Sequence, residues 1–259
     1  MSTTALIGAT GFVGSNLRRQ RPFAHLFRST TIGQIGQQQY DLVVCAAPSA
    51  VKWLANKHPE KDRAHVERLV ADLEPVRARR FVLISTVDVY PDPVAVNEDT
   101  HIPAESGQPY GRHRRRLERW VQERFGSALV VRLPQMFGPG LKKNFVYDLM
   151  KDNALELTDR RSRLQFYDVE RLWSDIEAAL AAGLTLINLP VEPATTEELA
   201  REAFNVNFVN ETDAGPVHYD MRSNRLQCLG RTSPYVMDRS EWFTRLRRFV
   251  STERELHTT

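Results

Sequence analysis

Residues 5–17 read ALIGATGFVGSNL, a short apolar run followed by three glycines at three-residue steps, Gly8, Gly11 and Gly14. Glycines between a strand and a helix let the chain turn sharply and let its backbone approach a pyrophosphate closely. The first turn of the new helix then offers unpaired N–H groups and a positive dipole end to the phosphates. We therefore expect a nucleotide at this turn. The alternative is a turn in which the glycines serve packing alone.

The composition is that of an ordinary globular protein. The chain has 259 residues, of which 42% are hydrophobic and 26% charged, so we expect a substantial core. No apolar run approaches the ~20 residues that span a bilayer, and no basic segment precedes the first strand, so we expect no membrane segment and no signal peptide. The two cysteines, Cys45 and Cys228, provide no disulfide framework. These absences favour a cytoplasmic protein.

Strand-like and helix-like segments alternate along most of the chain, which predicts parallel βαβ units. The expected strands cover residues 5–8, 25–27, 41–47, 81–86, 128–133 and 185–189. The expected helices cover residues 12–20, 62–73 and 110–125. This order predicts a doubly wound α/β fold, a parallel sheet of the Rossmann type, with ligands at the carboxyl ends of its strands.

The apolar strands lie mostly in the N-terminal half, which predicts two parts of unequal size. We expect a dinucleotide-binding domain over residues 1–135 that also receives segment 165–190. We expect a small interleaved C-terminal substrate lobe over residues 136–164 and 191–259.

Two later stretches carry hydroxyl groups at a characteristic spacing, ISTVDVY at residues 84–90 and PYGRHR at residues 109–114. Together with the glycines they resemble the extended short-chain dehydrogenase/reductase family, the NAD(P)-dependent sugar-nucleotide epimerases and dehydratases. That family has a Ser/Thr four residues before a tyrosine in the first stretch and Y-x-x-x-K in the second. Residues 131–140, 164–173 and 187–199 are similar to further family stretches. The match runs, with gaps, from residue 4 to about residue 200.

The resemblance implies an NAD(P)-dependent oxidoreductase or epimerase that acts on a hydroxyl or keto group of a sugar, which we expect to be nucleotide-linked. It makes Tyr110 the acid/base and Thr86 the group that holds the substrate oxygen. A tyrosine takes a hydroxyl proton only if its pKa, about 10 when unperturbed, is lowered by nearby positive charge. In the family a lysine one helical turn later supplies that charge. Here the position holds Arg114.

Arginine keeps the positive charge and the helical face of the lysine, but not the geometry of a compact ammonium ion. Three interpretations of Arg114 therefore stay open. It replaces the lysine with adjusted ribose contacts; or the site binds a cofactor but has lost most catalysis; or Arg114 is solvated and another basic residue acts.

Asp88 is a further catalytic candidate, because residues two apart on an extended strand share a face and Asp88 could point with Thr86 toward the substrate. The alternative is a solvated or loop-capping aspartate. Family dehydratases carry acidic residues directly after the Ser/Thr. Here Val87 follows, which argues against a full dehydratase pair.

The stretch about 20 residues past the glycines contains no carboxylate for an adenosine ribose. Arg28, assisted by Ser29, is instead expected to meet a 2′-phosphate, which favours NADP slightly over NAD. The alternative is an ordinary surface arginine. The expected cofactor-binding residues are Gly8, Thr10, Gly11, Phe12, Val13, Gly14, Arg28, Ser29, Ala46, Ala47, Pro48, Ser85, Tyr110, Arg114 and Pro134. The expected substrate-binding residues are Thr86, Gln135, Lys142, Lys143 and Asn144.

Other ligands are not expected. No histidine or cysteine group has metal-ligand spacing. The basic run over residues 112–119 has an apolar face, and the net charge is only +3, so we expect no nucleic acid. Family members often pair through long helices such as the one after Tyr110, so the resemblance admits a homodimer. Two other functions stay open: a non-catalytic NAD(P)-binding sensor or scaffold, and a reductase of a non-sugar metabolite carbonyl.

Overall fold

The computed structural model describes residues 3–256. Its first compact unit, drawn from Met1–Asp92, Asp99–Arg132 and Trp173–Ile187, contains a six-stranded sheet in the order β10-β6-β4-β3-β1-β2. The strands are β1 (Thr4–Ile7), β2 (His25–Phe27), β3 (Gln39–Cys45), β4 (Arg77–Thr86), β6 (Leu129–Leu133) and β10 (Leu186–Asn188). β1 pairs in parallel with β2 and with β3, and β3 pairs in parallel with β4.

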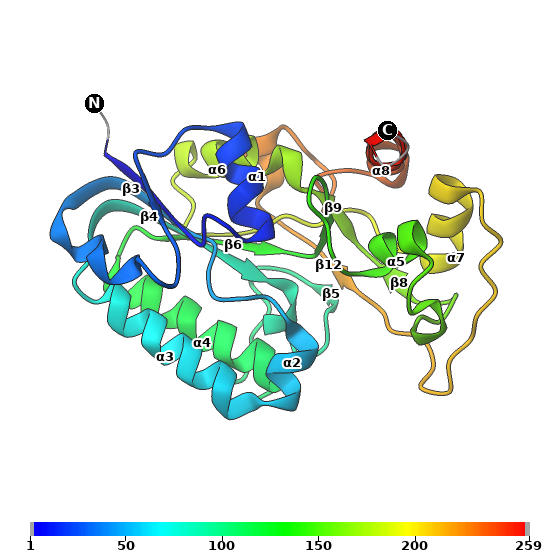
Figure 1. The fold of residues 1–259 in the computed structure, drawn as a ribbon, viewed down its shortest axis with the longest axis horizontal. Coiled ribbons are helices and arrows are strands. Elements are labelled where there is room, and N and C mark those ends of the chain that lie inside the picture. The colour runs from blue at the N-terminus through cyan, green and yellow to red at the C-terminus, as the bar shows by residue number, and fades with distance from the viewer. Residues whose placement is uncertain (1–2, 257–259) are drawn as a thin grey trace. The chain divides into compact units, whose positions relative to one another are not determined.

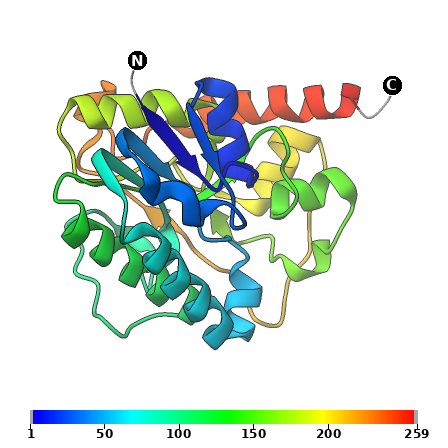
Figure 2. The same ribbon diagram turned by 60° about the vertical axis from the view of Figure 1, so that its left-hand side comes forward.

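Helices cover both faces of this sheet, as Figures 1 and 2 show: α3 and α4 lie side by side on one face, and α1 and α6 lie on the other. The helices of this unit are α1 (Phe12–Gln20), α2 (Lys52–Lys57), α3 (Pro59–Leu73), α4 (Pro109–Arg124) and α6 (Leu172–Ala181), with short 3₁₀ turns η1 (Ile32–Gln37) and η2 (Val87–Val89). The expected doubly wound α/β fold is confirmed.

Burial on two faces explains why the central strands read as continuous apolar runs. Val43, Val44 and Cys45 in β3 are fully buried, as strands covered by helices on both sides must be. β4 is longer than the apolar run predicts, since it begins at Arg77 and pairs with β3 through its exposed arginines. The backbone of β4 therefore pairs with β3 over a longer stretch than the buried, apolar part of the strand.

The second unit comprises the described parts of Pro93–Glu98, Leu133–Leu172 and Asn188–Thr259. Its strands are β5 (Val94–Val96), β7 (Gln135–Phe137), β8 (Arg163–Leu164), β9 (Phe166–Asp168), β11 (Ala194–Thr195) and β12 (Asp220–Met221), paired as β5 with β12, β7 with β9 and β8 with β11. Its helices are α5 (Phe145–Lys151), α7 (Thr196–Leu199) and α8 (Arg239–Leu256), with the shorter turns η3 (Leu155–Leu157), η4 (Val169–Arg171), η5 (Ala200–Phe204) and η6 (Leu226–Leu229).

A buried carboxylate ties distant segments of this second unit together. Glu98 accepts hydrogen bonds from the Ser223 hydroxyl at 2.6 Å and from the backbone N–H of Asn188 at 2.8 Å. Glu98 therefore joins the segment Pro93–Glu98 to two distant points of the C-terminal segment. The assignment of a substrate role to these segments stays a prediction.

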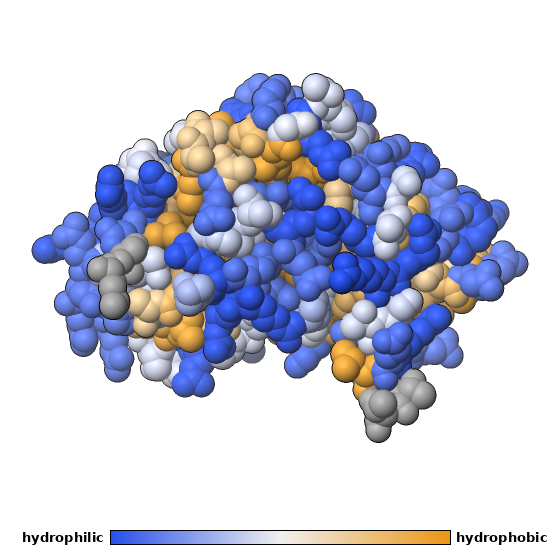
Figure 3. Space-filling model, turned by 90° about the horizontal axis from the view of Figure 1, so that it is seen from above, coloured by the Kyte–Doolittle hydropathy of each residue, from blue (hydrophilic) through white to orange (hydrophobic). Residues whose placement is uncertain are grey.

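The surface is mainly hydrophilic. The face seen in Figure 3 carries mostly polar and charged residues, in keeping with a mean hydropathy of −0.41 for the chain. Within residues 3–256, no helix combines the length and the apolar character needed to cross a membrane.

The turn between β1 and α1 is packed tightly. A Cβ atom on Gly14 would lie 2.1 Å from the Gly8 carbonyl oxygen, far inside van der Waals contact. Gly8 has a φ of +79°, and a Cβ atom there would lie 2.7 Å from the Ala46 carbonyl oxygen. Packing alone therefore requires glycine at both positions.

We expect Gly14→Ala to lower the free energy of unfolding by about 1–3 kcal/mol, the usual cost of overpacking, because its methyl group meets backbone that cannot move aside. Urea unfolding followed by circular dichroism measures this. Gly33→Ala is the control, since a Cβ atom there meets nothing within 4 Å. Equal stability of the two variants would contradict this account of the turn.

Candidate active site

The chemistry-bearing hydroxyl groups lie where β4 ends. Thr86 is the last residue of β4, and its Oγ1 accepts a hydrogen bond from the Asp88 backbone N–H at 3.2 Å. Tyr110 lies in the first turn of α4, where its backbone N–H donates to Oδ1 of Asn56 on α2 at 3.0 Å. The Thr86 side chain lies close enough to the Tyr110 hydroxyl group to lower its pKa. The spacing of the sequence motifs therefore brings the two side chains to the same place.

Gly111 makes this placement possible. A Cβ atom at this position would lie 1.9 Å from the Asp88 carbonyl oxygen, so only glycine lets the start of α4 approach the turn after β4 so closely. As a result Tyr110 is packed inward and is only 4% exposed.

Arg114 is buried against the face of the Tyr110 ring, with its guanidinium carbon 4.4 Å from the ring centroid. Its two terminal nitrogens donate to the Asp62 carboxylate at 3.1 and 3.0 Å, and one of them also donates to the Ser49 carbonyl at 2.7 Å. His113 Nδ1 lies 2.8 Å from the same carboxylate. The interpretation of Arg114 as a solvated residue is therefore wrong, because α3 and the loop after β3 supply partners for its charge.

Electrostatics set the protonation of these groups. Burial raises the pKa of the Asp62 carboxyl group. The hydrogen bonds and charge of Arg114 and of His113 lower this pKa by more, so the net pKa is below its ordinary value. Burial raises the pKa of Tyr110, and the negative charge of Asp88 raises it too. The positive charge of Arg114 lowers this pKa by less, so the net pKa is above its ordinary value. Tyr110 therefore holds its proton at neutral pH.

A buried ion pair anchors the helix that carries Tyr110. Glu118, fully buried on α4, accepts from Nε and a terminal nitrogen of Arg132 on β6 at 2.9 and 2.7 Å. The Ser85 hydroxyl on β4 donates to the same carboxylate at 2.6 Å, and Arg132 also donates to the Tyr90 hydroxyl at 2.7 Å. Sequence reasoning missed Glu118. The sequence did contain a sign of its burial: Glu118 is an isolated carboxylate one helical turn after Arg114 and directly follows the apolar Leu117.

Asp88 is neither a free carboxylate nor only a cap. Its Oδ2 accepts from the Thr86 hydroxyl at 3.2 Å, and its Oδ1 lies 2.6 Å from Nζ of Lys52, the first residue of α2. Lys52 was not among the predicted site residues. It follows β3 by a short loop, and because β3 and β4 are parallel neighbours, their carboxyl ends bring Lys52 and Asp88 to the same edge of the sheet.

The glycine turn fits the phosphates of a dinucleotide. Gly11 is exposed and is the N-cap of α1, with no side-chain cap, and the first turn of α1 holds no acidic residue. A Cβ atom on Gly11 would lie 3.4 Å from the Gly8 carbonyl oxygen, an ordinary contact, so packing does not require glycine there. The role of Gly11 at a phosphate stays a prediction, and an uncapped helix end is compatible with it.

Arg28 directly follows β2 at the same edge of the sheet. Its backbone N–H donates to the Thr31 hydroxyl at 3.0 Å, which fixes the turn. Within residues 3–256 the exposed Arg28 guanidinium takes part in no hydrogen bond or ion pair. A cation held at a fixed backbone position with no protein partner fits an incoming anion.

The remaining predicted residues divide between the two units. Seven lie in the first unit: Phe12 and Val13 begin α1, and Thr10, Ser29, Ala46, Ala47 and Pro48 lie in the loops after β1, β2 and β3. Pro134, Gln135, Lys142, Lys143 and Asn144 lie in the second unit. Asn144 is the N-cap of α5, where its side chain accepts from two backbone N–H groups and donates to the Met136 carbonyl at 2.8 Å. The substrate roles of Asn144, Gln135, Lys142 and Lys143 stay predictions, as does the cofactor role of Pro134.

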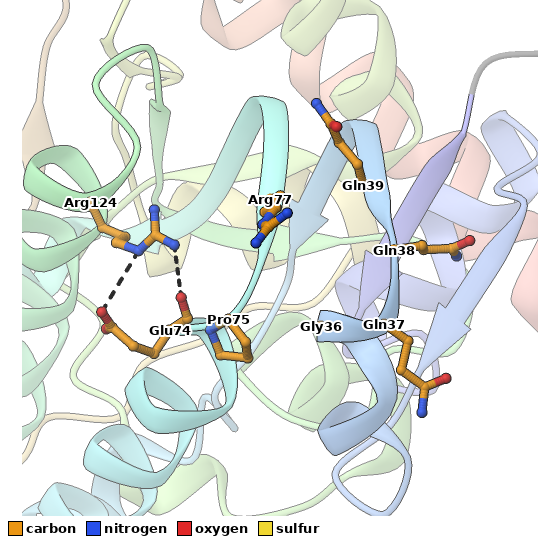
Figure 4. Close-up of a pocket in the computed structure, with 8 residues that line it drawn as sticks. All are labelled: Gly36, Gln37, Gln38, Gln39, Glu74, Pro75, Arg77 and Arg124. Carbon is orange, nitrogen blue, oxygen red and sulfur yellow. Dashed lines mark hydrogen bonds and ion pairs between the residues drawn. The ribbon is translucent and has the colours of Figure 1, made fainter.

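A hollow of about 440 Å³ in the first unit lies at the other end of the strands, as Figure 4 shows. It is lined by Gly36, Gln37, Gln38, Gln39, Glu74, Pro75, Arg77 and Arg124. Gln39 begins β3 and Arg77 begins β4, so the hollow faces the amino ends of these strands. Because parallel sheets bind ligands at the carboxyl ends, this hollow is separate from the candidate active site.

Comparison with known proteins identifies the family. The sequence model of the NAD dependent epimerase/dehydratase family matches residues 23–179, more than half of the chain. The chain belongs to this family. The match begins after the glycine turn, so the case for that turn rests on its geometry. No curated protein sequence matches the chain.

Solved structures of similar fold include enzymes named for nucleotide-linked sugars. dTDP-4-dehydrorhamnose reductase from Bacillus anthracis, in complex with NADP, has a TM-score of 0.76 at 18% identity and covers 96% of this chain and 98% of its own. UDP-N-acetylglucosamine 4-epimerase from Methanobrevibacter ruminantium has a TM-score of 0.75 at 14% identity, with 96% and 97% covered. UDP-glucose 4-epimerase from Thermotoga maritima has a TM-score of 0.75 at 14% identity, with 98% and 99% covered. At these identities the likeness establishes the fold.

We expect Glu118→Gln to lower the free energy of unfolding by about 3–5 kcal/mol, because it leaves the Arg132 guanidinium buried without a counter-charge. Thermal and urea unfolding measure this. Glu123→Gln is the matched control, since Glu123 is exposed on the same helix. A loss no larger than that of the control would show that the buried pair does not anchor α4.

Proposed function

We propose that the chain is an NAD(P)-dependent oxidoreductase or epimerase that acts on a hydroxyl or keto group of a nucleotide-linked sugar. Membership of the family supports the general reaction, and the named activities of the similar structures support the substrate class. The observation that carries the proposal is the placement of Tyr110 beside Thr86 at the carboxyl end of β4, with the Arg114 guanidinium on the tyrosine ring.

In this mechanism Thr86 holds the substrate oxygen and Tyr110 exchanges a proton with it. A bound nicotinamide supplies or accepts the hydride. Burial and the Asp88 charge raise the pKa of Tyr110, so its hydroxyl group is protonated at neutral pH and can donate to a keto oxygen. Arg114 orients the ring by lying on its face, with its own charge balanced by Asp62.

The proposed cofactor site uses the loops after β1, β2 and β3. Gly11 and the first turn of α1 hold the pyrophosphate, as the uncapped helix end favours. Arg28, assisted by Ser29, holds a 2′-phosphate, which makes NADP the preferred nucleotide. Ser85 and the loop after β3 line the rest of the site.

One observation favours a second candidate, a non-catalytic NAD(P)-binding sensor or scaffold. Asp62 balances the charge of Arg114, and the pKa of Tyr110 is raised where the family reaction in the oxidative direction needs it lowered. Tight nucleotide binding without turnover of any nucleotide-linked sugar, in either direction, would favour this candidate.

We expect Tyr110→Phe to reduce kcat by about 100-fold or more, because it removes the proton donor, and to weaken nucleotide binding much less. Turnover of a panel of dTDP- and UDP-linked keto sugars with NADPH measures kcat, and calorimetry measures affinity. Tyr147→Phe on α5 serves as the control. Undiminished turnover by the Tyr110 variant would contradict the role of Tyr110 as the acid/base.

We expect Arg28→Ala to weaken NADP binding about tenfold, which corresponds to about 1.4 kcal/mol, and to leave NAD binding unchanged, because only NADP carries the 2′-phosphate. Calorimetric titration with both nucleotides tests this. Arg19→Ala removes an equally exposed arginine from α1 and controls for net charge. Equal weakening of both nucleotides would contradict the 2′-phosphate role.

A further inference from the structure

We propose that α4 and the loop before it carry a second binding site, for a small ligand with two or more linked phosphate groups. The site is a hollow of about 360 Å³, called the arginine hollow below. All of its lining belongs to one stretch of the first unit, Asp99–Arg132, and none of it is expected at the candidate active site. The hollow is lined by Thr100, His101, Ile102, Ala104, Glu105, Arg112, Arg115, Arg116 and Arg119.

The helical repeat brings the four arginines of the hollow together. They follow one another by three, one and three residues, so their side chains share one face of α4. Tyr110, Leu117 and Val121 lie on the opposite face of the helix and are buried. Like charges at this spacing repel one another and destabilise a helix. A bound anion would remove that repulsion.

Most of this positive charge has no acidic partner in the protein. Within residues 3–256, the guanidinium groups of Arg112, Arg116 and Arg119 take part in no ion pair. Arg112 donates to the backbone carbonyl of Glu105 at 3.5 Å, which is a neutral acceptor. The carboxylate of Glu105 is the only acidic group among the lining residues, and four guanidinium groups outweigh it. The hollow is therefore a site of net positive charge.

Arg115 is held in place before any ligand arrives. One of its terminal nitrogens donates to the fully buried carboxylate of Glu118 at 3.0 Å, and its side chain is 27% exposed. Arg132 balances the charge of that carboxylate from inside the protein. A guanidinium carries five N–H donors, so Arg115 keeps donors for a ligand in the hollow that it lines. A donor fixed in advance loses less side-chain entropy on binding.

The donor type and the size of the hollow indicate the ligand. A guanidinium forms two parallel hydrogen bonds to a phosphate group, a geometry that its planar shape favours. Four of them at one hollow suit a ligand with several linked negative charges. The volume lies within the range of small-molecule sites, roughly 300–1,000 Å³. Ile102 and Ala104 offer contact area to the base or sugar of a nucleotide.

A nucleic acid fits this surface less well. Proteins meet its backbone with basic side chains spread along a surface, because the phosphates follow one another along the strand. Here His113 and Arg114, from the middle of the basic run, are buried and paired with Asp62. The basic groups that remain are gathered at a single hollow.

The first experiment titrates the chain with sodium tripolyphosphate. Calorimetry measures the affinity, and the N–H signals of the arginine side chains in NMR spectra report which of them the ligand contacts. We expect the double variant Arg116→Gln, Arg119→Gln to bind at least about tenfold more weakly, because it removes two charged donors. Both residues are exposed, so the fold should tolerate the change, and urea unfolding verifies this.

The matched control is the double variant Arg19→Gln, Arg68→Gln, which removes two exposed arginines of α1 and α3 outside the hollow. We expect it to bind tripolyphosphate as the parent does. The proposal would be overturned if the parent showed no saturable binding below about 1 mM, the upper end of the usual range for metabolites. It would also be overturned if loss of Arg116 and Arg119 left the affinity unchanged.

The second experiment identifies the source of the phosphate chain. It compares tripolyphosphate, ATP and a single-stranded oligonucleotide, each with the parent and with the Arg116, Arg119 double variant. If ATP binds more tightly than tripolyphosphate and the double variant loses this gain, the hollow is a nucleotide site. Equal affinities make it a site for the phosphate chain alone. Tighter binding of the oligonucleotide through the same arginines would overturn the assignment to a small ligand.

The hollow and the proposed function are tested separately. We expect the Arg116, Arg119 double variant to keep the NADP affinity and the keto-sugar turnover of the parent, since neither residue belongs to the candidate active site. If the parent reduces no nucleotide-linked sugar, the proposed function fails, and the tripolyphosphate titration still decides whether the hollow binds phosphate.

Discussion

The buried carboxylate of Glu118 holds together the pieces from which the candidate site is built. It joins α4 to β6 through Arg132 and to β4 through Ser85, the residue before Thr86. A charge that is fully buried is tolerated only when its partners satisfy it, so the position of α4 along the sheet is closely determined. Tyr110 occurs two turns earlier on that helix, and its meeting with Thr86 depends on this anchor.

Local sequence patterns were sufficient for the fold and for the two central hydroxyl groups. The short second strand over residues 25–27 and the helix over residues 12–20 are confirmed, because strand and helix periodicity are local properties. The placement of Tyr110 beside Thr86 could be predicted because a known family pattern places both. The start of β4 could not, since its exposed arginines pair through backbone and not through packing.

The charged partners of the site could not be predicted, because they come from distant parts of the chain. Asp62 precedes Arg114 by 52 residues and Lys52 precedes Asp88 by 36. Neither pair leaves a periodic signal, and both residues belong to helical segments where charged side chains usually face solvent. Their roles follow only from the parallel order of β3 and β4, which brings the loop after one strand to the turn after the other.

The arginine at position 114 makes contacts that a lysine could not make. In the family, the lysine of the motif supplies positive charge beside the tyrosine. A guanidinium is better suited than an ammonium ion to a two-point contact with a carboxylate and to stacking on an aromatic ring, and Arg114 does both. Arg114 therefore connects α3 to the Tyr110 ring, so that the charge beside the phenol is held in a fixed place by Asp62.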